Sequence, residues 1–580
     1  MFIKQIKTPK GRTYLQIVEG FRNEDGKPSH KTIEKLGYLD ELDKNHDGNG
    51  FDWAKQRLAE LSENNSTATS TNVPLRIMNK NESKLKNIGV LALNPVYYNL
   101  EIDKVCSAIQ TLNPKIDYSI DKVLRFLIHS RITDADSKRS AYLKKSEYIE
   151  NFDFSEDQMY RCMELLGNSR EQIKDFVTRN AMNKYNIDTS VAHYDGCNFY
   201  FEIDKEDEFR KKGASKEGRK EPIVNYGVLS DKNLIPIDIV IYPGNEQEYN
   251  YFAKVITQFK DKYKPGKIIY VADRGLNSGE NIFTALKTGN GYIYGQPIKS
   301  EKHKNFVLAD TNYNNVYDEY GVLVSKRKAS VEEDVEFTIT GPNGKKEKLK
   351  MPQLQIVTWS KKYAKKQKLE REKLISKAKN FIKTPKSFTK TKIGDAATFV
   401  KFANFDKDGN YLEDVNSLPQ LDEEAIAKQE KLDGYFMVVS SEIKMEPQDI
   451  LKAYSEQKGQ ERNFRVDKTF LKIRPVYLSR ESRIKAHVLV CYITHLLIKL
   501  LEVNVLNNKI PQERIIEDLK EYQCALIANN TYFLFKYNET TDLLASLSKT
   551  NARIETQSLS MIKNLFKGYW LYYFIILHRN

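Results

Sequence analysis

The chain has 580 residues, of which 40% are hydrophobic and 11% aromatic, and its formal net charge is +14. This length and composition exclude a disordered chain and predict two to four domains with sizeable cores. The excess of Lys and Arg favours a polyanionic partner such as nucleic acid, although a basic protein without such a partner can show the same balance.

Cysteine usage and apolar runs narrow the cellular context. The five cysteines are scattered and none belongs to a Cys-x-x-Cys pair, which argues against a disulfide framework and against a thiolate zinc site. No signal sequence is recognisable, and the most apolar runs are too short or too interrupted to span a bilayer. We therefore expect a soluble intracellular protein that has no membrane partner.

The first 186 residues divide into three parts. Residues 1–63 begin with alternating polar and apolar residues between turn signals, which predicts a small β-rich region. Residues 64–75 have the composition of a linker. Residues 76–186 show helical patterns with Ser155 and Ser169 as expected N-caps. Their basic side chains suit the binding of DNA ends, and a packed bundle with a solvated face explains them equally well.

Two aspartates occur in predicted strands of the next part, residues 187–285. The β-forming run 191–203 carries Asp195 near its centre, where a carboxylate among aromatic residues is costly unless it is paired or bound to a metal. The apolar strand 267–272 leads directly into Asp273, and ligand sites of α/β sheets lie at such strand ends. A carboxylate that caps a turn is the alternative interpretation at both positions.

Residues 286–445 interrupt the alternation of strands and helices. Strands are predicted at 292–296, 316–325, 335–340, 353–359, 398–405 and 434–440. A helical pattern at 361–383 carries many Lys and Arg residues. Such a run is usually a solvated face, and a surface that faces DNA fits it equally well. Residues 446–510 are predominantly helical, and the pattern of residues 511–580 also predicts helices.

One predicted helix, at 454–468, carries Tyr454, Glu461 and Lys468 seven residues apart. Seven residues are nearly two turns, so the three side chains drift by only about 20° per step and share one face. A helix of this kind would present a phenol, a carboxylate and an ammonium group along a phosphodiester. Taken alone, the spacing is more often that of a solvated amphipathic helix.

Two aspartates on strands and a glutamate on a helix are the ligands that two-metal phosphoryl transfer requires. In these residues the chain resembles the bacterial insertion-sequence transposases of the DDE class, in the group marked by Y-x2-R-x3-E-x6-K. Tyr454, Glu461 and Lys468 match that signature, and Gln457 occupies its arginine position. Further matches are Tyr-Asp at 194–195, Gly-Ala-Ser-Lys-Glu-Gly-Arg at 213–219, Pro-Gly-Asn at 243–245, Val-Ala-Asp-Arg-Gly at 271–275 and the segment 464–475.

The resemblance implies a fold and a set of site residues. The fold is an α/β, ribonuclease-H-like mixed sheet flanked by helices, whose two parts, 187–285 and 446–510, enclose a mainly β insertion domain at 286–445. Helical regions lie at both ends of the chain. Asp195, Asp273 and Glu461 are the implied ligands of two Mg²⁺ (or Mn²⁺) ions, and the implied DNA contacts are Tyr454, Gln457, Arg462, Lys468 and Arg274.

Gln457 departs from the signature. A glutamine lacks the charged fork with which arginine binds phosphate, so either Lys458 or Arg462 takes over this role or the contact is weaker.

The expected function is that of a DDE transposase in the bacterial cytoplasm, associated with the nucleoid. It would bind the terminal inverted repeats of its element, pair them in a homodimer or larger synaptic complex, cleave the ends and join each 3′-hydroxyl to target DNA. Two alternatives stay open at this point. One is a non-catalytic DNA-binding derivative, and the other is a metal-dependent nuclease that does not join.

Overall fold

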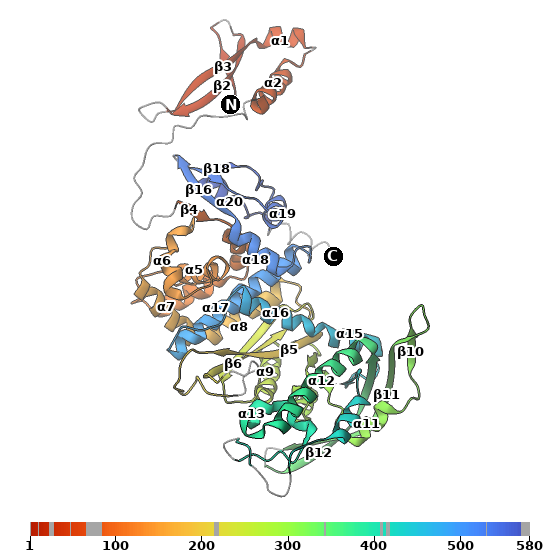
Figure 1. The fold of residues 1–580 in the computed structure, drawn as a ribbon. Coiled ribbons are helices and arrows are strands. Elements are labelled where there is room, and N and C mark those ends of the chain that lie inside the picture. The colour runs from red at the N-terminus through yellow and green to blue at the C-terminus, as the bar shows by residue number, and fades with distance from the viewer. Residues whose placement is uncertain are drawn as a thin grey trace. The chain divides into compact units, whose positions relative to one another are not determined.

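A computed structural model describes residues 2–9, 11–22, 28–46, 48–64, 84–213, 220–340, 344–406, 410–412, 418–528 and 530–569. They form two compact units, one of residues 1–80 with 527–530 and one of residues 81–526 with 531–580 (Figure 1). Most of the predicted linker, residues 65–75, and the motif residues 214–219 lie outside the described residues.

The first unit contains a three-stranded antiparallel sheet in the order β1-β2-β3. Two helices follow it, and a small core of Leu15, Leu42 and Ala54 joins them to the sheet. The elements are β1 Phe2–Lys7, β2 Thr13–Arg22, β3 Pro28–Tyr38, α1 Leu39–Asn45 and α2 Gly50–Asn64.

A nine-stranded sheet forms the centre of the second unit, in the order β10-β11-β12-β15-β9-β8-β5-β6-β7. β8 pairs in parallel with both β5 and β9, whereas β6 pairs antiparallel with both β5 and β7. The five strands on the β7 side are β5 Val191–Tyr200, β6 Ile223–Ser230, β7 Pro236–Pro243, β8 Ile269–Ala272 and β9 Gly291–Gln296. The sheet is therefore mixed, and its parallel part lies at β5, β8 and β9.

Helices cover both faces of this sheet, because successive side chains of a strand point to opposite faces. On one face, Ala192, Tyr194 and Tyr270 pack against α9 (Glu248–Tyr263) and α10 (Gly279–Lys287). On the other face, Val191, Val271 and Ile293 pack against α15 (Pro447–Glu456). The residues that alternate with Ala192 and Tyr194 along β5, among them His193 and Asp195, thus belong to the α15 face.

The helical region that precedes β5 shares one large core with β5, β6 and β7. Its elements are η1 Gly89–Leu93, α3 Asn94–Asn99, α4 Ile102–Leu112, α5 Ile120–Thr133, α6 Lys138–Leu143, α7 Glu156–Asn168 and α8 Arg170–Lys184. The predicted N-cap Ser155 forms a capping box with Gln158, and Ser169 caps α8 without a side-chain hydrogen bond.

The same core surrounds α17 (Glu481–Leu500), which is buried on all sides from Ala486 onward and continues into a π-helical turn at Leu501–Val505. By length and composition, Glu481–Val505 is the one helix among the described residues that could cross a membrane. Because 83% of its apolar window is buried within the protein, it is the core helix of this region.

The insertion extends the central sheet. β10 (Asn314–Tyr317), β11 (Leu323–Thr340) and β12 (Lys346–Ser360) continue it outward, and β15 (Tyr435–Ser440) connects them to β9. The insertion also contains α11 Glu301–Leu308, α12 Lys361–Lys383, α13 Lys390–Ile393, β13 Val400–Lys401, β14 Gln420–Leu421 and α14 Glu423–Glu430. The strand predicted at 398–405 is reduced to β13, because a 3₁₀ turn occupies Gly394–Phe399.

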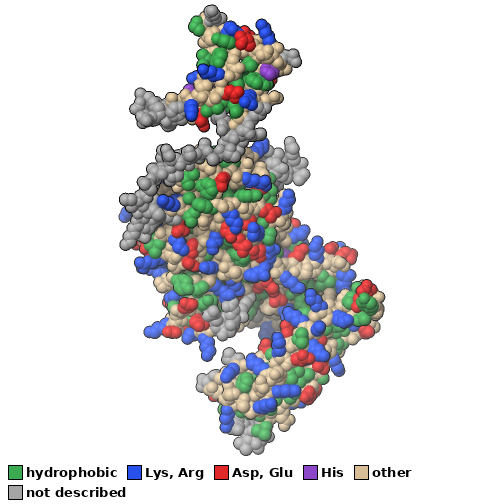
Figure 2. Space-filling model, turned by 45° about the horizontal axis from the view of Figure 1, so that its top comes forward, with side chains coloured by type: hydrophobic (Ala, Val, Ile, Leu, Met, Phe, Trp, Pro, Cys, Tyr) green, Lys and Arg blue, Asp and Glu red, His purple; other side chains and the backbone are tan. Residues whose placement is uncertain are grey.

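The basic helix α12 has the predicted bounds and contacts β11 and β12 (Figure 1). Its buried side carries Arg371, Ala378 and Phe381, whereas its lysines are exposed. Arg371 is 4% exposed and is held by Asp433 and Glu430. Figure 2 shows Lys and Arg side chains spread over the visible face among Asp and Glu.

The C-terminal region corrects the prediction of an all-helical segment. Besides α18 (Gln512–Glu521), α19 (Glu539–Leu547) and α20 (Leu559–Asn564), it contains β16 (Gln523–Ala528), β17 (Thr531–Leu534) and β18 (Thr556–Ser558). These strands form a sheet in the order β18-β17-β16-β4. β16 pairs with β4 (Leu85–Asn87), which comes from the other end of the unit. The residue pattern of 511–580 contains no information about so distant a partner strand.

Candidate active site

Asp195 and Asp273 lie level with one another on neighbouring strands. The parallel register pairs Ala192 with Tyr270 and His193 with Val271. Two residues further along both strands, the same register brings Asp195 beside Asp273, on the sheet face that α15 covers. Neighbouring strands are about 4.8 Å apart, so the two carboxylates occupy adjacent positions.

The two aspartates have different local roles. Asp195 is half-buried within β5, and its Oδ1 accepts a hydrogen bond from the backbone N–H of Gly196 at 2.7 Å. Asp273 follows β8 directly, is exposed, and caps the 3₁₀ turn Arg274–Leu276 through the N–H of Arg274 at 2.8 Å. Asp273 therefore caps a turn, as the alternative interpretation expected, and it does so through Oδ1. Its Oδ2 accepts no hydrogen bond from the described residues.

Glu461 lies on α16 (Lys458–Thr469), which contacts β5 and is hydrogen-bonded to β6 through Gln460. Two contacts fix the path of this helix over β5. Gln457, just before the helix, is hydrogen-bonded to His193 of β5. One turn after Glu461, Phe464 packs against Tyr226 of β6, the residue that pairs with Cys197 of β5. Asp195 lies between His193 and Cys197 on the strand, and Glu461 lies between Gln457 and Phe464 on the helix. The helix therefore carries the exposed Glu461 across the stretch of β5 that contains Asp195.

The single helix predicted at 454–468 is wrong, because α15 ends at Glu456 and α16 begins at Lys458. Gln457, at the junction, is only 9% exposed. Its Nε2 donates to the carbonyl of Tyr194 at 2.8 Å, and its Oε1 accepts from His193 Nδ1 at 3.0 Å. Burial lowers the pKa of His193 to about 4, so this ring is neutral near pH 7.

Gln457 is therefore a core residue, and the DNA contact predicted there is not compatible with this position. Its amide group is occupied by β5, so it does not belong to the exposed row that the heptad spacing suggested. Lys458, the next residue, is exposed at the start of α16.

Tyr454 and Arg274 meet beside Asp273. The Tyr454 hydroxyl donates to Asp273 Oδ1 at 3.1 Å, and its ring packs against Phe436 with 5.2 Å between centroids. Burial raises the pKa of Tyr454, which keeps the phenol protonated as a donor. Gly295 of β9 makes room for both side chains, because a Cβ there would lie 2.6 Å from Tyr454 Oη and 2.7 Å from Arg274 Cγ.

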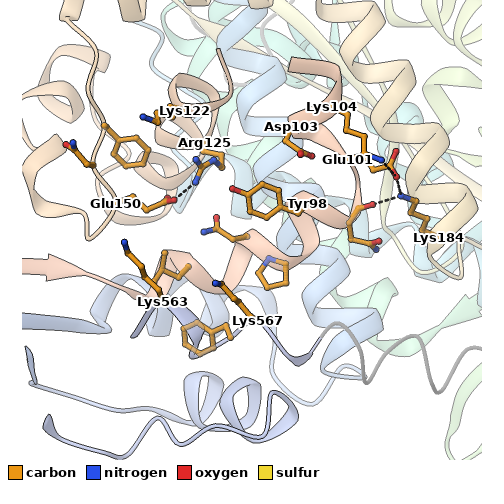
Figure 3. A pocket seen from close by; sticks show the side chains of 17 residues that line it. Tyr98, Glu101, Asp103, Lys104, Lys122, Arg125, Glu150, Lys184, Lys563 and Lys567 are labelled. Carbon is orange, nitrogen blue, oxygen red and sulfur yellow. Dashed lines mark hydrogen bonds and ion pairs between the residues drawn. The ribbon is translucent and has the colours of Figure 1, made fainter. Parts of the chain in front are cut away.

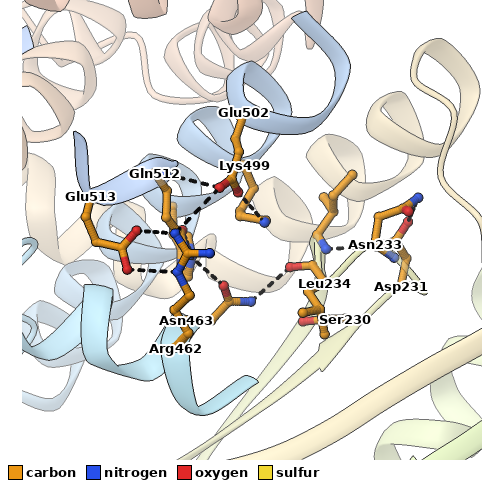
Figure 4. Close-up of polar contacts among 12 residues, drawn as sticks. Ser230, Asp231, Asn233, Leu234, Arg462, Asn463, Lys499, Glu502, Gln512 and Glu513 are labelled. Carbon is orange, nitrogen blue, oxygen red and sulfur yellow. Dashed lines mark hydrogen bonds and ion pairs between the residues drawn. The ribbon is translucent and has the colours of Figure 1, made fainter. Parts of the chain in front are cut away.

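Arg462 forms an ion pair within the protein, and its side chain is 41% exposed. Its Nε donates to Glu513 Oε1 of α18 at 2.8 Å and its Nη2 donates to Glu513 Oε2 (Figure 4). Arg465 donates to the same carboxylate at 3.2 Å. These guanidinium groups lower the pKa of Glu513 to about 2. Lys468 is half-buried and forms no ion pair with the residues that the structure describes.

A second set of polar contacts joins α16 to α18 beneath this ion pair. Gln512 Nε2 donates to Asn463 Oδ1 at 3.0 Å, and Asn463 Nδ2 donates to the carbonyl of Leu234 at 2.9 Å (Figure 4). Gln512, Glu513 and Asn463 were not predicted from the sequence, because polar residues of amphipathic helices carry no local sign of their partners.

The donor set fits a hard cation in its chemistry, since Mg²⁺ and Mn²⁺ prefer carboxylate oxygens. Two of the three acids are adjacent across parallel strands, and the third lies on the helix above them. Within the described part of the chain, however, no three His, Cys, Asp or Glu side chains are already grouped around a common point as metal ligands.

Comparison with known proteins gives two family matches. The family described as the transposase DDE domain matches residues 199–497, which include Asp273 and Glu461 and begin four residues after Asp195. The family described as the N-terminal domain of IS1634 family transposases matches residues 3–71. No curated protein matches the chain. A cryo-EM structure of the piggyBac transposase synaptic complex with hairpin DNA is similar over 70% of each chain, with 8% identity and a TM-score of 0.35.

Proposed function

The chain belongs to the insertion-sequence transposases with a DDE catalytic domain, and from this premise we propose that Asp195, Asp273 and Glu461 are its catalytic carboxylates. One observation carries the assignment. The parallel register of β5 and β8 brings two aspartates from distant parts of the sequence level with one another, on the face that α16 crosses. The mixed sheet with helices on both faces supports a ribonuclease-H-like catalytic domain.

The three carboxylates would hold two divalent cations, Mg²⁺ or Mn²⁺. Such a pair of ions stabilises the attacking and leaving oxygens of an in-line displacement at phosphorus. Tyr454 holds the Asp273 carboxylate in place through its hydroxyl, and burial keeps that hydroxyl protonated. Around this centre Arg274, Lys458 and Lys468 supply positive charge for DNA phosphates.

The reaction has two steps. In the first, water attacks the phosphorus at the end of the element, the P–O3′ bond breaks, and a 3′-hydroxyl and a 5′-phosphate remain. In the second, this 3′-hydroxyl attacks a phosphodiester of the target, forms a new P–O bond and releases a target 3′-hydroxyl. The partners are thus terminal inverted repeats and target DNA, in a homodimer or a larger synaptic complex within a bacterial nucleoid. The net charge of +14 supports a DNA partner.

The test uses Asp195→Asn, Asp273→Asn and Glu461→Gln, each of which keeps the shape of the side chain and removes a metal-binding charge. Cleavage of terminal DNA should be lost in all three variants, and gel-shift binding of uncleaved ends should stay close to that of the parent. Asp261→Asn, at an exposed position of α9 on the opposite face of the sheet, is the matched control and should cleave normally.

Each result assigns or removes a residue. A variant that cuts at the parental rate takes its residue out of the site. A parent that binds ends but cuts none would indicate a non-catalytic derivative, and one that cuts without joining would indicate a nuclease.

A further inference from the structure

A cavity lies between the helical region and the segment that follows α16. Its volume is about 430 Å³, within the range of roughly 300–1,000 Å³ that is typical of small-ligand sites. Its walls come from the end of α5, the start of α6, residues 472–478 and His487 of α17. Basic residues of the helical region and the end of the motif segment 464–475 therefore meet at one place, although 336 positions separate Asp136 from Lys472.

Lys138 is a buried cation of this cavity that has no counter-ion. It is 5% exposed, lines the cavity, and forms no hydrogen bond or ion pair with any residue that the structure describes. Its ammonium nitrogen opens into the cavity, whereas Nε of the nearby Arg131 is sealed within the packing. Burial and the charge of Arg131 lower the pKa of Lys138 well below its ordinary value. A positive charge at this position is therefore costly unless an anion accompanies it.

Arg131 supplies a second buried positive charge behind the cavity. It is 1% exposed, and its guanidinium group donates to backbone carbonyls, among them that of Asp136 at 2.8 Å. These carbonyls satisfy its hydrogen bonds but leave its charge uncompensated. The two carboxylates that act on it are both engaged with other cations. Asp134 pairs with Lys144, and Asp136 pairs with Lys472.

A larger cavity of the same unit, shown in Figure 3, is built differently. There the buried Arg125 is held by Asp121 at 3.0 Å and by Glu150. Lys184 is held by Glu101 at 2.7 Å. The buried cations of that cavity thus have counter-ions from the protein itself, and the cation of the smaller cavity does not.

The other polar residues of the smaller cavity suit an oxyanion. Lys472 and Arg474 add positive charge to its lining, and the hydroxyl groups of Ser137 and Tyr477 are hydrogen-bond donors. The oxygen atoms of a phosphate group accept charge-assisted hydrogen bonds, and an ammonium group binds phosphate as a point charge. A phosphate group would therefore supply the anion that Lys138 lacks.

The helix α16 leads from the three carboxylates towards this cavity. It carries Glu461 in its first turn and Lys468 in its last, and the chain after it lines the cavity from Lys472 onward. From Glu461 to Thr469 the helix rises by about 12 Å, at about 1.5 Å per residue. A DNA strand advances by about 3.4 Å per nucleotide, so a strand that follows α16 reaches the cavity within about four nucleotides. DNA bound for cleavage is thus the nearest source of a phosphate group.

We propose that this cavity binds a backbone phosphate of the DNA, with Lys138 as the direct contact and Arg131 as a fixed positive charge behind it. The site lies outside the three carboxylates and takes a phosphate that is not cleaved. The proposal rests on the proposed function, because the DNA that it binds is the substrate of the transposase. Free inorganic phosphate has the same chemistry, and the experiment separates the two sources.

The experiment uses the full-length protein in buffer with EDTA, so that binding is measured without cleavage. The first measurement is the melting temperature at increasing concentrations of inorganic phosphate and constant ionic strength. The second is the affinity for a duplex of terminal DNA with 5′-hydroxyl ends, whose phosphates all belong to the backbone, at several salt concentrations. The variants are Lys138→Met and Lys138→Gln. The matched control, Lys563→Gln, replaces an exposed lysine of the larger cavity that forms no ion pair with described residues.

In phosphate-free buffer Lys138→Met should melt no lower than the parent, because it removes a buried cation without a counter-ion. Phosphate should raise the melting temperature of the parent and of Lys563→Gln more than that of either Lys138 variant. Both Lys138 variants should bind the duplex about 10- to 150-fold more weakly, the loss that corresponds to one hydrogen bond to a charged group. Their salt slope should fall by about 0.9, the value for one lost phosphate contact. Lys563→Gln should bind as the parent does.

Duplex binding by Lys138→Met that matches that of Lys563→Gln would overturn the proposal. If phosphate stabilises the parent through Lys138 while duplex binding is unchanged in both variants, the cavity takes a free oxyanion and the assignment to DNA fails. A Lys138→Met protein that melts below the parent would show that the lysine supports the fold, which also overturns the proposal. Asp195→Asn should respond to phosphate and bind the duplex as the parent does, so a failure of this site is distinguishable from a failure of the catalytic assignment.

Discussion

Replacing Glu513 by Gln should loosen the helix that carries Glu461. Glu513 accepts hydrogen bonds from Arg462 and Arg465 of α16, and the neighbouring Gln512 binds Asn463 of the same helix. The glutamine keeps the size of the side chain but removes the charge that both arginines face. Because Arg462 follows Glu461 directly in the chain, a looser α16 should also slow strand cleavage.

The magnitude follows from the pKa of Glu513, which falls from its ordinary value of 4.5 to about 2. At about 1.4 kcal/mol per unit, the unscreened shift corresponds to roughly 3 kcal/mol. Since the Arg462 side chain is 41% exposed, solvent screens the pair, and we expect about 1–2 kcal/mol. The folded-state pKa is depressed, so this stabilisation is present above pH 4.5 and is lost as the pH falls from 4.5 towards 2.

Hydrogen exchange of the α16 amides measures this local stability directly. In Glu513→Gln the α16 amides should exchange about 5- to 30-fold faster than in the parent above pH 5, which corresponds to about 1–2 kcal/mol of local opening free energy. The ratio of the two exchange rates should shrink as the pH approaches 2. Cleavage of terminal DNA should fall in parallel.

The matched control is Asp542→Asn, which breaks a similar two-bond ion pair with Arg553 at 2.9 and 2.6 Å in the same C-terminal region. It should leave α16 exchange unchanged. If Glu513→Gln alters α16 exchange no more than Asp542→Asn does, the α18 contacts do not stabilise the catalytic helix and the reasoning fails.

Three further predictions follow from the same contacts. Gln457→Arg should lower the free energy of unfolding by about 1–3 kcal/mol, because it buries a cation and removes the hydrogen bonds to His193 and Tyr194. An unchanged melting temperature would contradict this expectation. Tyr454→Phe should preserve the fold but reduce cleavage roughly tenfold by removing one hydrogen bond to a carboxylate, and parental cleavage would show that this bond has no role. Replacing exposed lysines of α12 by Gln should reduce the salt dependence of DNA binding by about 0.9 for each phosphate that is no longer bound, and an unchanged slope would mark α12 as a solvated face.

Local interactions explain what the sequence by itself determined. The bounds of α12, the capping box at Ser155 and Gln158, and the strand that leads into Asp273 all follow from residue patterns and from hydrogen bonds between near neighbours. The resemblance to DDE transposases, carried by short motifs around Tyr454 and Glu461, likewise needed only residue types and spacing. These features depend on interactions within a few residues of each position, so the sequence alone was enough to predict them.

The tertiary structure decided the features that depend on distant partners. The helix is interrupted at Gln457, whose side-chain amide is bound to β5, more than 250 residues earlier in the chain. Arg462 pairs with Glu513 of α18, and β4 pairs with β16 in the sheet of the C-terminal region. A helix pattern or a charged side chain is compatible with several such partners, and only the folded packing selects one, because a buried polar group must find its hydrogen bond wherever the chain brings one.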